Sequence, residues 1–307
     1  MSLESAAVSN PVSALEQLKA HFAEILDLYG TQGLLGWDLE TYMPKSGSAL
    51  RANQLATLSK ISHQLETSPQ IGDWLEELEA QKDRLSGIDR AFIRQVRREY
   101  DRKVKIPESL VTEMVRVTAE AHHIWLDARE QKSFKVFAPC LEKIVGLNRQ
   151  MAEAVGYQGS PYNALLDDYE PDLTVDELEP VFQTLKHALV PLIQKIKSKP
   201  LPEIAFLHRQ YTQDKQLAFS EEVLKAMGFD FDAGRLDLSV HPFSSGAGIT
   251  DVRLTTRVNE NDLFSALSSS MHEGGHGLYE QGISPEFERT PLAHGTSLGI
   301  HESQSRL

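Results

Sequence analysis

The chain of 307 residues is 41% hydrophobic and 24% charged, a balance typical of a globular protein with a sizeable core. Its net charge of −13 argues against a general nucleic-acid or anionic-membrane surface, because such partners need a basic footprint. Cys140 is the single cysteine, which favours a reducing compartment, and residues 1–12 lack the basic start and apolar core of a signal peptide. These features predict a cytoplasmic protein that binds neither nucleic acid nor membrane.

Helical periodicity extends over the first two-thirds of the sequence. Apolar residues recur every three or four positions in segments that predict helices at 11–30, 48–66, 70–84, 89–105 and in a stretch opened by Pro107. Gly30 is placed as a helix stop, so we expect residues 30–47 to be irregular. Thr174 and Glu177 have the spacing of a capping box and predict the start of a further helix.

The spacing of the apolar residues changes beyond residue 230, from every three or four positions to every second position. Alternating apolar residues predict two short strands, at 236–240 and 252–256, with the glycine-rich stretch 244–248 between them. An edge strand of this kind can pair with an extended peptide through its backbone.

The segment after these strands contains His272-Glu273-Gly274-Gly275-His276, an H-E-x-x-H motif. On a helix, imidazoles at i and i+4 project from one side and can bind one metal ion, while the carboxylate at i+1 can act on a water beside that metal. The motif therefore indicates His272 and His276 as metal ligands and Glu273 as a general base. A single match of this kind leaves chance about as good an explanation, so further residues are needed.

The helix carrying this motif is predicted to begin at Asn261-Asp262 and to end at Gly282. Its large apolar residues share one stripe, away from the histidines: Leu263, Phe264, Leu267, Met271 and Leu278. The three glycines of the motif region each cost about 1 kcal/mol of helix propensity relative to Ala. Their presence favours close approach of another backbone or of a ligand.

A second predicted helix follows Gly295, with Thr296 or Ser297 as its cap, and it carries Glu302. Two histidines and one carboxylate leave the fourth position of a tetrahedral ion open, which is the arrangement of catalytic zinc sites. His301 is the competing ligand on this helix. We rank it second, as a substrate-binding or outer hydrogen-bonding side chain, because adjacent helical residues diverge by about 100°.

Further segments accompany these residues in order: His241-Pro242-Phe243, Asp251-x-Arg253-x-Thr255, and His301-Glu302-Ser303-Gln304, with 37–44 and 162–170 upstream. Together they resemble the carboxypeptidase Taq family of metallocarboxypeptidases over nearly the whole chain. We therefore expect a mainly α protein, an elongated helical zincin-like metallopeptidase with a small β-sheet beside the metal helix. No repeat or linker divides it, so we expect one domain over 1–307, with a helical cleft wall (1–230) and a region of sheet and metal-binding helices (231–307).

The resemblance implies a zinc-dependent metallocarboxypeptidase that acts on peptides, with cobalt as an alternative metal, and a homodimer. It also places His241 and Arg253 at the substrate, with Asp251 and Gln304 as outer hydrogen-bonding partners of the metal site. On spacing alone, Asp251 and Arg253 indicate a structural ion pair equally well. Two other functions remain open: an endo- or aminopeptidase with the same ligands, and a non-catalytic metal-binding protein.

Family chains continue beyond the H-E-S-Q helix with two further motifs, one of which carries an arginine for the terminal carboxylate of the substrate. We therefore expect this chain to be a truncated or proteolysed piece of a longer enzyme. Glu302 then lies near a fraying helix end. This predicts exposed apolar surface at Leu298 and Ile300, and a metal site that is empty, distorted or completed by a neighbouring chain.

Overall fold

The computed structural model describes residues 11–200, 202–295 and 297–306. These residues are mainly helical with a three-stranded sheet, which confirms the predicted fold class. They divide into two compact units: unit 1 contains residues up to 39, 43–147 and 283–294, and unit 2 contains 40–42, 148–282 and 295 onward. The single domain over 1–307 stays a prediction. Within the described ranges, every helix is too short or too polar to cross a lipid bilayer.

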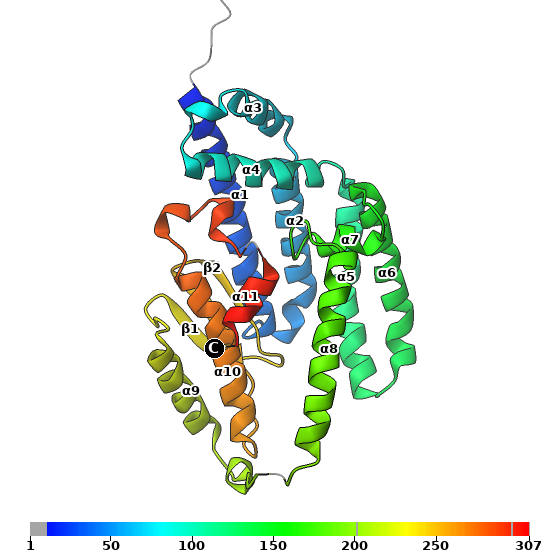
Figure 1. Ribbon diagram of the computed structural model, residues 1–307, viewed down its shortest axis with the longest axis vertical. Helices are drawn as coiled ribbons and strands as arrows, with labels where there is room; N and C mark the ends of the chain where they lie inside the picture. The colour runs from blue at the N-terminus through cyan, green and yellow to red at the C-terminus, as the bar shows by residue number, and fades with distance from the viewer. Residues whose placement is uncertain (1–10, 201, 296, 307) are drawn as a thin grey trace, which may run out of the picture. The chain divides into compact units, whose positions relative to one another are not determined.

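Unit 1 is built from helices α1 (Pro11–Glu40), α2 (Ser48–Glu66), α3 (Pro69–Glu79), α4 (Gly87–Lys103), α5 (Glu108–Glu130) and the first part of α6 (Phe134–Val155), all visible in Figure 1. Short 3-10 turns complete it: η1 (Lys45–Gly47), η2 (Lys82–Arg84), η4 (Pro285–Phe287) and η5 (Pro291–Ala293). The helices predicted at 48–66, 70–84 and 89–105 are thus confirmed to within a few residues, with a break before η2.

Helix α1 shows that the expectation of an irregular stretch from residue 30 was wrong. A glycine that ends a helix commonly adopts a positive φ. Among the described glycines, only Gly156, Gly159 and Gly228 have a positive φ, so Gly30 lacks this feature of a helix end. The helix continues to Glu40, and Trp37, which is buried, prolongs the stripe begun by Phe22 and Ile25. Burial of this stripe outweighs the roughly 1 kcal/mol propensity cost of a glycine inside a helix.

The core of unit 1 lies where α1, α3 and α4 meet. Each helix contributes apolar side chains spaced three or four residues apart, which is the pattern of one buried helical face. Its buried members are Ala14, Leu18, Phe22, Ile25, Ile71, Leu75, Leu78, Phe92, Ile93 and Val96.

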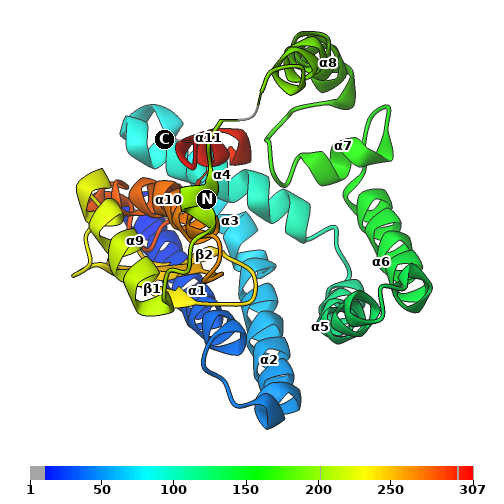
Figure 2. The ribbon, with the colours of Figure 1, turned by 90° about the horizontal axis from the view of Figure 1, so that it is seen from below.

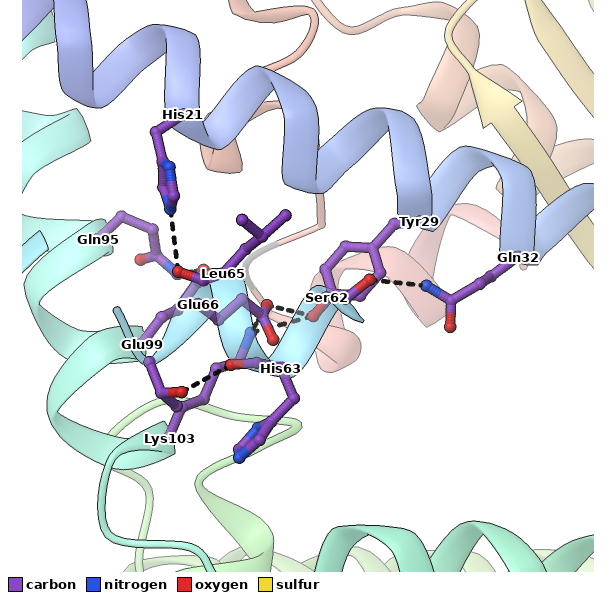
Figure 3. Close-up of polar contacts among 11 residues, drawn as sticks. His21, Tyr29, Gln32, Ser62, His63, Leu65, Glu66, Gln95, Glu99 and Lys103 are labelled. Atoms are coloured by element: carbon purple, nitrogen blue, oxygen red, sulfur yellow. Dashed lines mark hydrogen bonds and ion pairs between the residues drawn. The ribbon is translucent and has the colours of Figure 1, made fainter. Parts of the chain in front are cut away.

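A polar network joins α1, α2 and α4 in unit 1 (Figure 3). Glu66, with a side chain only 7% exposed, accepts hydrogen bonds from the Tyr29 hydroxyl and from Lys103 Nζ. Lys103 Nζ also donates to the Tyr29 hydroxyl at 3.2 Å. Burial raises the pKa of Tyr29, so the phenol keeps its proton and donates it to the carboxylate.

Replacing Glu66 with Ala should lower the free energy of unfolding by about 2–3 kcal/mol, because it leaves the Lys103 ammonium poorly solvated and without the buried carboxylate that it pairs with. The matched control is Glu79→Ala, which removes an ion pair to Arg97 on the exposed surface of the same unit. Loss of that pair should lower the free energy of unfolding by less than about 1 kcal/mol. Chemical denaturation of both variants measures the difference, and equal losses would contradict the assignment.

Unit 2 contains α7 (Pro161–Leu166), α8 (Val175–Lys197), η3 (Ala205–His208), α9 (Gln213–Met227), β1 (Gly234–Leu238), β2 (Ser244–Gly248), β3 (Asp251–Thr256), α10 (Leu263–Gln281) and α11 (Leu298–Gln304). The predicted capping box opens α8. The Thr174 hydroxyl accepts a hydrogen bond from the Glu177 backbone N–H at 3.3 Å, and the Glu177 carboxylate accepts one from the Thr174 N–H at 3.0 Å.

The sheet has the order β1-β3-β2, with β1 parallel and β2 antiparallel to β3. Two strands are confirmed near their predicted positions, and the glycine-rich stretch between them, for which the sequence predicted no strand, is a third strand. At Gly246 a Cβ atom would lie 2.7 Å from the Asp251 carbonyl oxygen, so only glycine permits this close pairing. The sequence pattern hid the strand because glycines carry no alternating side chains.

Helix α10 is the central element of unit 2. It packs on β3, on β2 and along α9, and Figures 1 and 2 both show α9 and α10 side by side against the sheet. The core between these elements consists of Leu224, Phe229, Val252 and Leu254. The predicted metal-binding helix is therefore held on several sides before any ligand is considered.

Candidate metal centre

Helix α10 begins and ends where the sequence predicts. The Asp262 carboxylate accepts hydrogen bonds from the N–H groups of Phe264 and Ser265 at 3.1 and 3.3 Å, and Gly282 follows the last turn. The buried face differs from the predicted apolar stripe, since Phe264 is 58% exposed while Ala266 is buried. The fully buried residues of α10 are mostly small, together with Glu273 and His276, because neighbouring elements approach the helix axis closely. Leu278 of the predicted stripe is partly buried and packs against the core of unit 2.

The glycines of the motif explain this close packing. A Cβ atom on Gly274 would lie 2.3 Å from a methyl carbon of Leu224, and one on Gly277 would lie 2.7 Å from a core aromatic ring. A Cβ atom on Gly275 would lie 2.1 Å from the Gln304 backbone oxygen, at the end of α11. The expected close approach of another backbone is thus confirmed, and that backbone belongs to the helix carrying Glu302.

Helix α11 begins after Ser297, whose hydroxyl accepts a hydrogen bond from the Ile300 N–H at 3.1 Å. Ser297 is therefore the cap, and Thr296, the other predicted cap, lies outside the described residues. Leu298 and Ile300 are exposed, as predicted. The helix directs Glu302 toward the two histidines of α10.

Donor atoms of His272, His276 and Glu302 all lie within 4.8 Å of one another. The Glu302 Oε2 atom is 3.6 Å from His276 Nε2 and 3.9 Å from His272 Nε2. Ligands of a tetrahedral zinc ion, at bond lengths near 2.0–2.2 Å, are separated by about 3.4 Å. Two imidazole nitrogens and one carboxylate oxygen at this separation fit a single divalent ion of the zinc type with small adjustments.

Glu273 is 6% exposed and lies beside this cluster on α10. Burial, together with the negative charge of Glu302, raises the pKa of Glu273 to about 7. A bound cation opposes the Glu302 contribution, because positive charge favours the carboxylate form. Burial and the neighbouring His301 lower the pKa of His276, which favours the neutral imidazole that a metal requires.

A chain of side chains leads away from the cluster behind His276. Its Nδ1 atom is 2.8 Å from His301 Nδ1, and His301 Nε2 is 2.8 Å from Glu280 Oε1. A single tautomer assignment satisfies both contacts and leaves His276 Nε2 free for a metal: His276 Nδ1–H donates to His301, and His301 Nε2–H donates to Glu280. The two imidazole rings stack at an interplanar angle of 17°.

Sequence reasoning missed Glu280. The available signal was its spacing, four residues after His276, which places both side chains on one face of α10. Among 44 acidic residues that spacing carried no weight until the position of His301 was known. His301 itself contacts the predicted ligand His276. Its role as a substrate-binding or an outer hydrogen-bonding side chain stays a prediction.

The other predicted site residues lie on or beside the sheet and at the end of α11. Arg253 donates to the Asp251 carboxylate through two nitrogens, at 2.8 and 3.0 Å, so the predicted ion pair is present. His241 is exposed, with Nδ1 2.7 Å from the Pro242 carbonyl oxygen. Gln304 donates to the adjacent Ser303 hydroxyl at 3.4 Å, which is a long hydrogen bond.

A His-x-x-x-His pair on one helix, a carboxylate from a second helix and a buried glutamate beside the first histidine are typical of metallopeptidases. The family model described as carboxypeptidase Taq (M32) metallopeptidase matches residues 17–307. The chain belongs to this family, which confirms the resemblance read from the sequence. Members of the family are hydrolases of peptide bonds, and the family implies a divalent metal.

Known relatives of the chain are also named as carboxypeptidases. Thermostable carboxypeptidase 1 of Thermus thermophilus is 39% identical over 96% of this chain and 60% of its own length. Carboxypeptidase 1 of Bacillus subtilis is 36% identical over 93% of this chain and 56% of its own length. The crystal structure of an M32 carboxypeptidase from Deinococcus radiodurans superposes with a TM-score of 0.86 at 36% identity, over 96% of this chain and 59% of the other. The chain spans about three-fifths of these relatives.

Proposed function

We propose that this chain carries the catalytic centre of a zinc-dependent metallocarboxypeptidase that removes C-terminal residues from peptides. The observation that carries the proposal is the convergence of the donor atoms of His272, His276 and Glu302 within 4.8 Å. Two imidazoles and one carboxylate favour zinc, with cobalt as the alternative, and leave a position open for chemistry. We propose cleavage at the C-terminus of the peptide, rather than at its N-terminus, because the relatives are named carboxypeptidases.

A divalent ion at this site supplies Lewis acidity, which makes water more acidic and polarises a carbonyl group. Glu273 acts as general base: its carboxylate accepts a proton from the attacking water and then passes it to the leaving amine. Its burial keeps bulk water away from the proton and raises its pKa above the ordinary range of a glutamate, so the carboxylate is a stronger base. Glu280 and His301 hold His276 in one tautomer and orientation.

The sheet offers a means of holding a peptide. Among the residues that the structure describes, β1 and β2 are the two edge strands of the sheet, and each pairs with β3. An extended substrate can add to such an edge through backbone hydrogen bonds, independently of its side chains. We place His241 and Arg253 at the substrate, and Asp251 and Gln304 as supporting side chains, on the family resemblance.

The proposal also includes a cytoplasmic homodimer. Native mass spectrometry of the purified protein tests the oligomeric state.

The test of the reaction uses one peptide in three forms: free, amidated at the C-terminus and acetylated at the N-terminus. After removal of metal by a chelator and addition of zinc, we expect cleavage of the free and acetylated peptides, and loss of nearly all cleavage on amidation. Mass spectrometry of the products identifies the end that is released. Release of N-terminal residues would favour an aminopeptidase, and one equivalent of bound zinc without cleavage would favour a metal-binding protein.

A further inference from the structure

Helix α11 cannot fix the position of Glu302 by itself. It has seven residues, and isolated helices shorter than about 12–15 residues are marginal in water. Its Ser297 cap supplies one local hydrogen bond, while Leu298, Gly299 and Ile300 are exposed. Contacts from other parts of unit 2 must therefore decide where the Glu302 carboxylate lies.

One such contact comes from the segment between α7 and α8. The Glu170 Oε2 atom accepts hydrogen bonds from the Ser297 hydroxyl at 2.9 Å and from the Gly299 N–H at 3.0 Å. The adjacent Tyr169 carbonyl accepts one from the Leu298 N–H at 2.8 Å. These bonds satisfy N–H groups at the start of α11 that have no partner inside the helix, and they place a negative charge at its positive end.

Glu170 is itself firmly held. Its N–H donates to the Leu166 carbonyl at 2.9 Å, and its carbonyl accepts from the Leu173 N–H at 3.2 Å. The Asn163 side chain accepts from the Val175 N–H at 2.9 Å, which ties this turn to the start of α8. The carboxylate therefore extends from a turn that is fixed by its own hydrogen bonds.

The two ends of α11 are thus fixed by different parts of unit 2. Glu170 and Tyr169 bind the first turn, and the backbone of Gln304 packs on Gly275 of α10 at the other end. Glu302 lies between these two attachments. A shift of the first turn pivots the helix about its contact with α10 and moves the carboxylate relative to the histidines.

We infer that Glu170 is a positioning residue for the metal centre, which holds the first turn of α11 so that the Glu302 carboxylate lies within reach of His272 and His276. The inference rests on the ligand set of the proposed function. Glu170 is not a member of the ligand cluster. It acts through the backbone of α11, and a carboxylate suits this task because charge-assisted hydrogen bonds are roughly twice as strong as neutral ones.

Zinc affinity, measured by competition with a chromophoric chelator, tests the inference without any measurement of activity. Glu170→Ala should lower the affinity about 10-fold, the lower end of the range seen when supporting residues of metal ligands are lost. The control is Glu177→Ala, which removes a carboxylate that accepts a hydrogen bond from the Thr174 N–H in the capping box of its own helix, α8, in the same unit. Its zinc affinity should stay within about twofold of the parent, since no proposed ligand lies on α8.

The deciding measurement repeats Glu170→Ala in a Glu302→Ala background. If Glu170 acts by positioning Glu302, then Glu170→Ala should not lower zinc affinity further in this background, because the carboxylate that Glu170 positions is absent. A loss of equal size in both backgrounds would show a general structural role and overturn the inference. If Glu302→Ala alone leaves the affinity unchanged, the proposed ligand set fails instead, so the two failures are distinguishable.

A second variant protects the test against loss of folding. Glu170→Gln keeps the size and one acceptor oxygen, and should lower zinc affinity by a smaller factor, about threefold. Hydrogen exchange of the backbone amides of residues 297–304 should accelerate in Glu170→Ala and remain unchanged in Glu177→Ala. Unaltered affinity in both Glu170 variants would overturn the inference.

Discussion

Replacing Glu273 with Gln is expected to lower kcat by about 10²- to 10⁴-fold, which is the usual contribution of a general base. Gln fills the same volume in the buried position but cannot accept a proton from water. The zinc content should stay near that of the parent, since Glu273 is not a member of the ligand triad. Steady-state kinetics on a C-terminally free peptide, with metal analysis of the same preparation, measures both quantities.

The pH dependence gives an independent check on the same residue. Burial raises the pKa of Glu273 to about 7 in the metal-free site, and a base must be deprotonated to act, so activity should be lost toward acidic pH. The acidic limb lies lower to the extent that a bound cation stabilises the carboxylate. If Glu273→Gln with full zinc content cleaves peptide at a rate near that of the parent, Glu273 is not the base.

The parts of the site that the sequence predicts are those with local signatures. The start of α10 at Asp262 and the cap at Ser297 follow from side chains that bond to the backbone within three residues, and the end of α10 follows from the glycine at position 282. The ligand spacing on α10 follows from helix geometry alone. These patterns require no knowledge of the rest of the chain, and the structure agrees with each of the boundaries.

The parts that sequence reasoning missed depend on contacts between distant segments. Glu280 gains importance only because α11 places His301 beside it, and Glu170 only because its turn meets the first turn of α11. The course of α1 through Gly30 was missed for a related reason, since burial of the later face outweighs a local stop signal. One sequence without related sequences carries no direct record of such contacts.

The glycines of the motif are a local sequence signal for a contact between distant segments. The sequence identified them as costly in a helix and attributed the cost to close packing, and the structure shows α11 packed on Gly275. The spacing of the two helix axes, and hence the separation between Glu302 and the histidines, therefore depends on the absence of a side chain at that position. This dependence allows a test that leaves every ligand intact.

Replacing Gly275 with Ala should lower zinc affinity by about 10- to 100-fold and the free energy of unfolding by about 1–3 kcal/mol. The new Cβ atom would lie 2.1 Å from the Gln304 backbone oxygen and 2.6 Å from the Ser305 Cα atom, so α11 must move away from α10 and carry Glu302 with it. The free energy of unfolding should change in the opposite direction in the control Gly36→Ala in α1, where no atom outside the adjacent residues and the helix's own backbone lies within 4 Å of the added carbon. There Ala should stabilise the helix by up to about 1 kcal/mol and leave zinc affinity unchanged. Chelator competition and chemical denaturation on both variants provide the comparison, and parent-like zinc affinity in Gly275→Ala would show that the contact between α10 and α11 does not control the metal centre.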